Sequence, residues 1–215
     1  MRQTVSSNSN IKEPLIIGIA GGSGAGKTTF SQALHSALKP QSSFLLKIDD
    51  YYRDLSDMPY EQRKRVNFDH PDALDMGMLA EHLSRLKEFK PIKKPVYNFN
   101  NHCRSDEYEK VEPHNIIIAE GILLFIYDFI RNCIEFKIFL DVSTDKRFDR
   151  RMTRDVSQRN RTPKSVKKQY YSTVEPMYKL FVDPSKQHAD LVLRDGDMID
   201  WTKKVMSELN LRKLL

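Results

Sequence analysis

The 215-residue chain is predicted to be an α/β protein with a parallel sheet, helices on both faces of that sheet and one inserted β-hairpin. Two observations predict this class. Short, almost continuous apolar runs recur along the sequence, which is typical of parallel strands that are covered on both faces. Amphipathic helical patterns separate these runs, and alternating strands and helices imply one sheet with right-handed crossovers.

The expected strands are residues 15–20, 44–48, 116–119, 136–142 and 191–193. Apolar residues at helical spacing predict helices within 28–38, 78–86, 123–130, 148–156, 170–181 and 199–209. Phe148, Met152 and Val156 give the fourth of these helices an apolar side. Ile199 and Leu209 help to form the apolar side of the last one.

Residues 91–113 break the alternation of strands and helices. Their apolar residues recur with a period closer to two than to 3.6, which predicts an inserted β-hairpin that could serve as a substrate flap. Residues 15–215 are expected to form one domain. Residues 1–14 are polar and rich in Ser and Asn, so they are expected to be a flexible tail. They lack the apolar segment of a secretory signal, so no such signal is expected there.

Composition limits the cellular setting. The two cysteines, Cys103 and Cys133, form no CxxC pair, so we expect neither a disulfide framework nor a zinc site. We therefore expect a cytoplasmic location. The apolar region 116–130 is interrupted by Glu120 and Asp128, so no membrane span is expected. Ten of the 35 Lys/Arg lie within residues 145–168, with only three Asp. This local positive charge predicts an anionic ligand at one place.

A glycine-rich phosphate loop is the most specific motif. It fits the pattern G-x-x-x-x-G-K-[ST] and consists of Gly21, Gly22, Ser23, Gly24, Ala25, Gly26, Lys27 and Thr28. It lies between an expected strand and an expected helix, and this context disfavours an ordinary glycine-rich turn. Backbone N–H groups of such a loop and of the helix N-terminus bind phosphate oxygens. Lys27 would neutralise the outer phosphates, and the Thr28 hydroxyl could bind Mg²⁺.

Acidic residues follow two of the expected strands. Asp49 and Asp50 come after 44–48, and Glu120 comes after 116–119. In open α/β sheets, ligands bind at the carboxyl ends of the strands, so these carboxylates could bind Mg²⁺ or accept a proton. The alternatives are a solvated loop acid or helix cap for the aspartates, and a structural ion pair for Glu120. Spacing does not decide which aspartate points inward.

Arginines and aromatic residues complete the set of candidates. Arg147, Arg151 and Arg154 share one helix face, and Arg159 and Arg161 follow. Such arginines could close over a triphosphate; the alternative is a solvated basic helix.

The rings of Phe68 and Tyr97 lie in polar surroundings and could hold a flat base. The alternative is that both belong to the core.

These residues resemble those of uridine kinases (uridine–cytidine kinases), which belong to the P-loop kinase class. The most specific matches are Asn-Phe-Asp-His-Pro-Asp-Ala at 67–73 and Glu-Gly-Ile-Leu at 120–123. Further matches are residues 20–29, 49–53, 95–97, 102–104, 150–151, 154–155, 159–161 and 184–190. The resemblance therefore covers most of the chain and implies a P-loop kinase-type parallel sheet.

The resemblance also implies a role for each matching residue. Asp49 would be the catalytic base, and Lys27, Arg154 and Arg159 would assist the transfer. The phosphate donor would contact the loop 21–28 together with Thr29, Arg151, Arg154 and Arg161. Mg²⁺ would be surrounded by Thr28, Asp49 and Glu120. The nucleoside would be held by Asp49, Tyr52, Phe68, Asp69, Tyr97, His102, Arg159 and Gln169, with His102 and Tyr97 reading the base. Residues 145–168 would form an arginine-rich lid.

The activity implied by the resemblance is transfer of a phosphoryl group from ATP or GTP to the 5′-hydroxyl of uridine, and also of cytidine. Mg²⁺ would be required, and a homo-oligomer, a tetramer, would be expected. One alternative is a related kinase for another acceptor, such as nicotinamide riboside, ribulose phosphate or pantothenate. Another is a non-enzymatic ATP- or RNA-binding protein. No RNA-binding motif accompanies the basic segment, so neither nucleic acid nor a membrane is an expected partner.

The sequence departs from the family pattern in three places. Asn98, Asn100 and Asn101 replace acidic or small residues near the base-reading histidine, which affects base preference. Asn160 stands where the family has glycine. Residues 194–198 differ from the stretch expected after the last strand, which affects contacts with the donor's adenine and any regulatory nucleotide.

Overall fold

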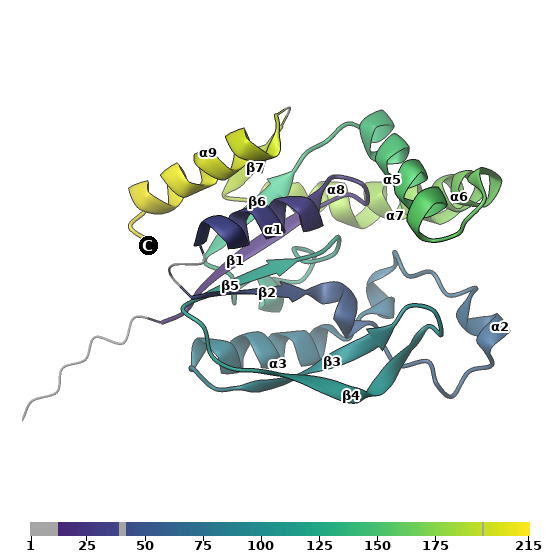
Figure 1. Cartoon of the computed structure of the whole chain (residues 1–215), viewed down its shortest axis with the longest axis horizontal. Helices are drawn as coiled ribbons and strands as arrows, with labels where there is room; N and C mark the ends of the chain where they lie inside the picture. The colour runs from purple at the N-terminus through teal and green to yellow at the C-terminus, as the bar shows by residue number, and fades with distance from the viewer. Residues whose placement is uncertain (1–12, 39–41, 195) are drawn as a thin grey trace, which may run out of the picture.

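The computed structural model describes residues 13–38, 42–194 and 196–215. Its centre is a five-stranded sheet with the order β2-β5-β1-β6-β7 (Figure 1). The strands are β1 (Leu15–Gly21), β2 (Ser43–Lys47), β5 (Ile116–Glu120), β6 (Phe136–Leu140) and β7 (Leu191–Leu193). All neighbouring pairs are parallel. The predicted parallel sheet is therefore confirmed, and each strand is found where it was expected. The expected tail 1–14 lies almost wholly outside the described residues.

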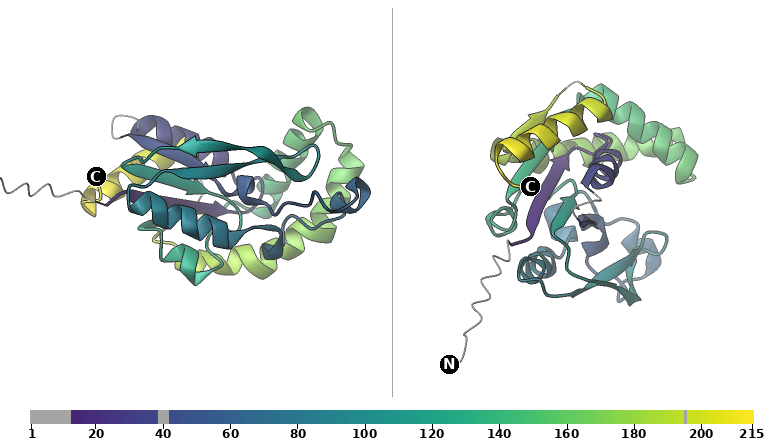
Figure 2. Two further views of the ribbon diagram at one scale, coloured as in Figure 1. Left: turned by 90° about the horizontal axis from the view of Figure 1, so that it is seen from below. Right: turned by 60° about the vertical axis from the view of Figure 1, so that its left-hand side comes forward.

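Two apolar cores lie on opposite faces of the sheet. On one face, α1 (Lys27–Leu38) and α9 (Met198–Leu211) pack against β1, with the rings of Phe30 and Trp201 in edge contact at 5.8 Å. On the other face, α3 (Met76–Lys87) contributes Leu79, Leu83 and Leu86. Figure 2 shows this layering from two further directions. Because both faces are covered, the strands can be apolar along their whole length.

The inserted hairpin is also confirmed. It consists of β3 (Ile92–Asn98) and β4 (Cys103–Val111), which form a separate antiparallel sheet (Figure 1). The hairpin lies beside the short helical turn η2 (Ile48–Tyr51), which directly follows β2. Three short elements, α2 (Tyr60–Arg63), η3 (Pro71–Ala73) and α4 (Asp128–Arg131), lie in the connections.

A helical region runs from α5 to η6: its first part, α5 and α6, lies beyond the end of the sheet near the phosphate loop, and the rest returns behind the sheet (Figure 1). It contains α5 (Thr144–Gln158), α6 (Pro163–Gln169), α7 (Glu175–Met177), α8 (Asp183–Ser185) and η6 (Lys186–His188). Two π-helical segments, η4 (Tyr170–Val174) and η5 (Tyr178–Val182), interrupt it. Each is followed two residues later by a proline, Pro176 or Pro184. A proline removes an α-helical hydrogen bond, which explains the wider turns.

Three expectations about helices are wrong. Of the expected helix 123–130, only residues 128–130 are helical, in α4, and residues 123–126 form turns, because the consecutive Leu123, Leu124 and Phe125 are all buried and no single helix face could bury them. In α5, Val156 is exposed, and the buried side is formed by charged residues. In α9, Ile199 is 65% exposed, and the buried face is formed by Trp201, Val205 and Leu209. Within the described residues, no helix is long and apolar enough to span a membrane.

Candidate active site

The phosphate loop connects β1 to α1 and closes tightly on helix α5. At Gly24 the backbone has φ +82°, and a Cβ atom there would lie 2.2 Å from the carbonyl oxygen of Arg147. Only glycine tolerates both conditions. The ammonium group of Lys27 donates hydrogen bonds to the carbonyls of Gly21 (2.9 Å) and Gly22 (3.1 Å). Lys27 is therefore held at the mouth of the loop, where burial lowers its pKa and the charges of nearby carboxylates oppose this shift.

The loop threonine and the acid of β5 are joined directly. The Thr28 hydroxyl donates a hydrogen bond of 2.9 Å to Oε1 of Glu120, which is the last residue of β5. Burial raises the pKa of Glu120, whereas Lys27 lowers it. The described residues contain no cluster of three or more His, Cys, Asp or Glu that could hold a metal. A hydroxyl and carboxylates are nevertheless hard oxygen ligands that suit Mg²⁺, which retains several waters. The residues present therefore fit that ion.

Asp49 lies in η2, at the carboxyl end of β2. The residue is accessible to solvent. Desolvation by the surrounding protein raises the pKa of Asp49, and the charge of Lys27 opposes this shift. Its neighbour Asp50 pairs with Lys94 of the hairpin, on another side of the turn. The two aspartates thus differ in their surroundings: Asp50 pairs with Lys94, whereas Asp49 interacts electrostatically with Lys27, Arg154 and Arg159. This geometry favours Asp49 as the inward-facing acid that spacing alone does not identify.

Four lid arginines converge on one buried carboxylate. Asp155 is fully buried, and its Oδ1 atom lies 2.8 Å from Arg154 and 3.5 Å from Arg159. Its Oδ2 atom lies 3.4 Å from Arg151 and 3.9 Å from Arg161. These positive charges are therefore held together without any ligand, which compensates for their mutual repulsion.

Further contacts connect the lid to the phosphate loop. Arg151 donates a hydrogen bond of 2.7 Å to the Ser23 hydroxyl and another of 3.0 Å to Oε1 of Gln169. Arg161 also donates to that amide oxygen. Gln169, which was expected to contact the nucleoside, is thus occupied with the two arginines. It could still influence the site by orienting them.

Arg147 does not belong to the lid. It is only 1% exposed, its guanidinium stacks on the ring of Tyr178 at 3.7 Å, and its Nε donates to the carbonyl of Val142. Its NH1 atom points toward Gly22, where a Cβ atom would lie 2.5 Å away. Arg147 therefore supports the phosphate loop from beneath, although it was expected on one open face with Arg151 and Arg154.

The predicted base-binding aromatics form one cluster beside Asp49. The ring centroid of Tyr52 lies 5.2 Å from that of Phe68 and 5.3 Å from that of Tyr97. The ring of His102 stacks on Phe68 with 5.1 Å between their centroids. Tyr97 and Tyr52 are nearly buried, whereas Phe68 and His102 are partly open. His102 has φ +50°, a strained backbone conformation that is common at functional sites. The cluster is therefore partly core and partly open to solvent.

Two other observations concern the polar groups of this cluster. The hydroxyl oxygen of Tyr97 is buried and has no hydrogen-bond partner among the described residues. Asp69 is also buried, which raises its pKa, and Arg151 opposes that shift. Asp49 and Asp69 interact electrostatically, so the aromatic cluster and the strand-end acids belong to one site.

Asn160 adopts φ +51°, which asparagine tolerates better than most residues and which suits a position where glycine is expected.

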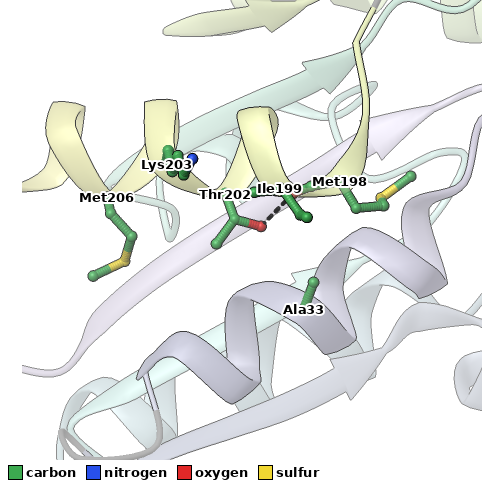
Figure 3. A pocket seen from close by; sticks show the side chains of 6 residues that line it. All are labelled: Ala33, Met198, Ile199, Thr202, Lys203 and Met206. Carbon is green, nitrogen blue, oxygen red and sulfur yellow. Dashed lines mark hydrogen bonds between the residues drawn. The ribbon is translucent and has the colours of Figure 1, made fainter.

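A separate groove lies away from these residues (Figure 3). It has a volume of about 450 Å³ and lies between α1 and α9, lined by Ala33, Met198, Ile199, Thr202, Lys203 and Met206. The Thr202 hydroxyl donates to the carbonyl of Met198, so it does not face the groove as a free donor. None of the predicted site residues lines it. The groove does approach the phosphate loop, because the Met198 methyl group lies 3.2 Å from where a Gly26 Cβ would be.

Sequence reasoning assigned no role to three residues that organise the site: Asp155 and Arg104, which lie in the matched segments, and Lys94. The spacing of Arg147, Arg151 and Asp155, four residues apart, could have placed Asp155 on the same helix face as the two arginines, although its burial is seen only in the structure. Arg104 donates hydrogen bonds to the carbonyls of Tyr52 (2.9 Å) and Tyr51 (3.4 Å). Nothing in the sequence indicates that contact, because it joins β4 to a loop 52 residues earlier.

A phosphate loop after β1, acids at the ends of β2 and β5, and clustered arginines above a parallel sheet define a P-loop kinase. A sequence profile of the phosphoribulokinase / uridine kinase family matches residues 16–201, and the chain belongs to this family. Membership implies a nucleotide phosphoryl donor, which P-loop kinases use with Mg²⁺.

Individual relatives agree with this assignment. The chain is 46% identical over 184 residues to a uridine kinase from Ligilactobacillus salivarius (strain UCC118), covering 86% of both proteins. It is 44% identical to a uridine kinase from Geobacillus sp. (strain WCH70), covering 86% of this chain and 88% of that protein. Among solved structures, phosphoribulokinase from Rhodobacter spheroides superposes with a TM-score of 0.63 at 12% identity, covering 86% of this chain and 72% of the other. That likeness concerns the fold alone.

Proposed function

We propose that this protein transfers a phosphoryl group from ATP to the 5′-hydroxyl of uridine, and also of cytidine. One observation carries the proposal. Asp49 lies within electrostatic reach both of Lys27 in the phosphate loop and of Asp69 and Tyr52 at the aromatic cluster. A base between a phosphate site and an apolar ring pocket suits transfer from a nucleotide to the hydroxyl of a nucleoside.

The reaction requires a proton to leave the attacking hydroxyl. Asp49 accepts this proton while the nucleoside oxygen attacks the γ-phosphorus and the bond to the β-phosphate oxygen breaks. Lys27, Arg154 and Arg159 stabilise the charge that develops on the transferring group. Thr28, Asp49 and Glu120 would hold Mg²⁺, which supplies further charge neutralisation when bound. Arg151 and Arg161 would hold the donor phosphates under the lid, and the closed lid would exclude water.

The acceptor pocket explains a preference for pyrimidine nucleosides. The partly open rings of Phe68 and His102 would contact the flat base. The unpaired hydroxyl of Tyr97 and the ring nitrogens of His102 would form hydrogen bonds to its polar edge. The buried Asp69 would bind ribose hydroxyls. Relatives that are called uridine kinases support this choice of acceptor over nicotinamide riboside, ribulose phosphate or pantothenate.

The experiment that tests the proposal is ADP release from Mg²⁺-ATP with no acceptor, uridine, cytidine, adenosine or nicotinamide riboside. We expect strong stimulation by uridine and cytidine, and little by the other two. Stimulation by nicotinamide riboside alone would contradict the pyrimidine assignment. ATP binding without stimulation by any acceptor would contradict the catalytic assignment and favour a non-enzymatic ATP-binding protein.

Three details of the proposal need measurements of their own. GTP may be compared with ATP as the donor in the same assay. A homotetramer is proposed from the resemblance to uridine kinases, and light scattering after gel filtration would test it. A cytoplasmic location is proposed from the sparse cysteines, and fractionation of cells that express the protein would test it.

A further inference from the structure

Lys94 of the hairpin is buried and forms an ion cluster with the partly buried Asp50 and the exposed Glu109. Its Nζ atom lies 2.6 Å from Oδ2 of Asp50 and 3.0 Å from Oε2 of Glu109, and its side chain is only 8% exposed. Glu109 lies directly opposite Lys94 in the register of β3 and β4. Asp50, in contrast, belongs to η2 and is the immediate neighbour of Asp49. The cluster therefore links the hairpin to the turn that carries the proposed catalytic base.

From this geometry we infer that Lys94 is a positioning residue, which acts through Asp50 to hold the Asp49 turn against the hairpin. The inference rests on the proposed function, because it assigns Asp49 the role of base. Lys94 itself contacts neither substrate in this scheme. The same hairpin carries Tyr97 and His102, so the tether fixes the distance between the base-reading residues and the base that activates the hydroxyl.

The electrostatics of Lys94 agree with a tether. Burial lowers the pKa of Lys94, but hydrogen bonds with Asp50 and Glu109 outweigh this effect and raise it overall. The ammonium group is therefore charged at neutral pH. A buried charge is strongly disfavoured without its partner, so the turn and the hairpin resist separation.

A second contact explains why this tether acts on Asp49 in particular. Arg104 fastens the other strand of the hairpin to the carbonyls of Tyr51, the last residue of η2, and of Tyr52, the residue after it. Loss of Lys94 would leave that contact intact, so the hairpin would stay folded against the protein. Only the segment next to Asp49 would gain freedom. An error of about 1 Å in the geometry of a reacting group can reduce turnover about a hundredfold.

The test compares Lys94→Met with Lys93→Met, which removes the same charge from an exposed neighbour on the same strand. We expect kcat to fall at least about tenfold in Lys94→Met, whereas the KM for ATP stays within about twofold because the phosphate loop is untouched. Lys93→Met should resemble the wild type in both parameters. Lys94→Arg, which retains the charge, should recover part of the lost kcat.

The double variant Asp50→Asn/Lys94→Met separates positioning from stability. Removing both charges leaves no unpaired buried charge, so the melting temperature should return toward that of the wild type. The kcat should stay as low as in Lys94→Met, because the two residues act as one unit. Recovery of kcat together with the melting temperature would overturn the inference.

Hydrogen exchange provides a readout that does not depend on activity. Amides of residues 48–52 should exchange faster in Lys94→Met and in the double variant than in the wild type or in Lys93→Met. Unchanged exchange there would overturn the tether. If the wild type itself shows no nucleoside-dependent ADP release, the proposed function fails, and this exchange measurement alone decides whether the tether exists.

Discussion

The hydroxyl of Thr28 and Oε1 of Glu120 are joined by a hydrogen bond of 2.9 Å, although 92 residues separate them in the sequence. The contact joins the first turn of α1 to the end of β5. Two predicted Mg²⁺ ligands therefore lie side by side before any metal binds. This arrangement follows from the pairing of the strands. β5 runs parallel to β1, and Glu120 lies opposite Ile19 near the end of β1.

Changing Thr28 tests the metal assignment. Thr28→Val keeps the shape of the side chain but removes the hydroxyl. We expect the Mg²⁺ concentration for half-maximal ADP release to rise about tenfold or more, because a ligand and the orienting partner of Glu120 are both lost. Thr28→Ser, which retains the hydroxyl, should stay near the wild-type value. An equal Mg²⁺ requirement in all three proteins would contradict the assignment.

Asp49→Asn tests the proposed base. The amide cannot accept the proton, so kcat should fall by about 10²–10⁴-fold. Because Asp49 is accessible to solvent, thermal unfolding should hardly change. Asp57→Asn, at an exposed position in the loop after η2, is the matched control and should keep full activity. Near-normal turnover of Asp49→Asn would exclude Asp49 as the base.

Asp155→Asn tests whether the buried carboxylate organises the lid. Four arginines would lose their common counter-charge. We expect the free energy of unfolding, measured in urea, to fall by about 1–3 kcal/mol and the KM for ATP to rise several-fold. Asp149→Asn, at an exposed position of the same helix, controls for the loss of one acid. A lower stability with an unchanged KM would mean that Asp155 supports only the fold.

Tyr97→Phe separates stability from binding. The Tyr97 hydroxyl is buried without a partner among the described residues, which costs free energy in the nucleoside-free protein. Its removal should therefore leave the melting temperature unchanged or raise it. If the hydroxyl binds the base, the KM for uridine should rise about three- to tenfold, in line with one lost hydrogen bond. A reduced melting temperature with an unchanged KM would indicate a purely structural tyrosine.

The strands and the phosphate loop could be predicted because their signals are local. An apolar run such as Ile116–Ala119 needs cover on both faces whatever surrounds it. The segment after it could not be predicted in this way. Leu123, Leu124 and Phe125 fit a helical pattern, but the chain buries all three in a turn against the second core. The conformation of this segment depends on which side chains the folded protein buries, and local periodicity does not indicate that.

Some site residues could likewise be predicted from local signals, and others could not. Lys27, Thr28 and Glu120 could be found because motif and strand ends place them. Helix α5 could not be oriented from its apolar residues, because its buried side is Arg147, Arg151 and Asp155. A stripe of this kind is stable only when each charge finds its partner, such as the Ser23 hydroxyl for Arg151. The partners of the two arginines, Ser23 for Arg151 and Tyr178 for Arg147, come from distant segments and become visible only in the folded structure.

A last prediction concerns the support of the Asp49 turn, where Tyr51 and His82 meet. The Tyr51 hydroxyl and Nδ1 of His82 are 2.9 Å apart, and both residues are buried. Burial lowers the pKa of His82, and Glu81 opposes this shift while Arg85 and Arg104 reinforce it. The neutral imidazole is therefore favoured in the folded state, whereas the unfolded chain binds a proton near the usual pKa of 6.5.

The sign of the pH dependence follows from this difference. Between pH 6.5 and the lower pKa of the folded state, the unfolded chain binds more protons, so the contribution of His82 to stability is lost as the pH falls. The melting temperature should therefore drop between about pH 7.5 and about pH 5.5. His82→Asn, whose amide can replace Nδ1 as the partner of Tyr51, should show a smaller drop. His102 and His188, whose pKa values burial also lowers, remain in both proteins, so the difference between the two drops isolates His82. Equal drops would mean that His82 does not titrate on unfolding, and that its role at the turn is packing alone.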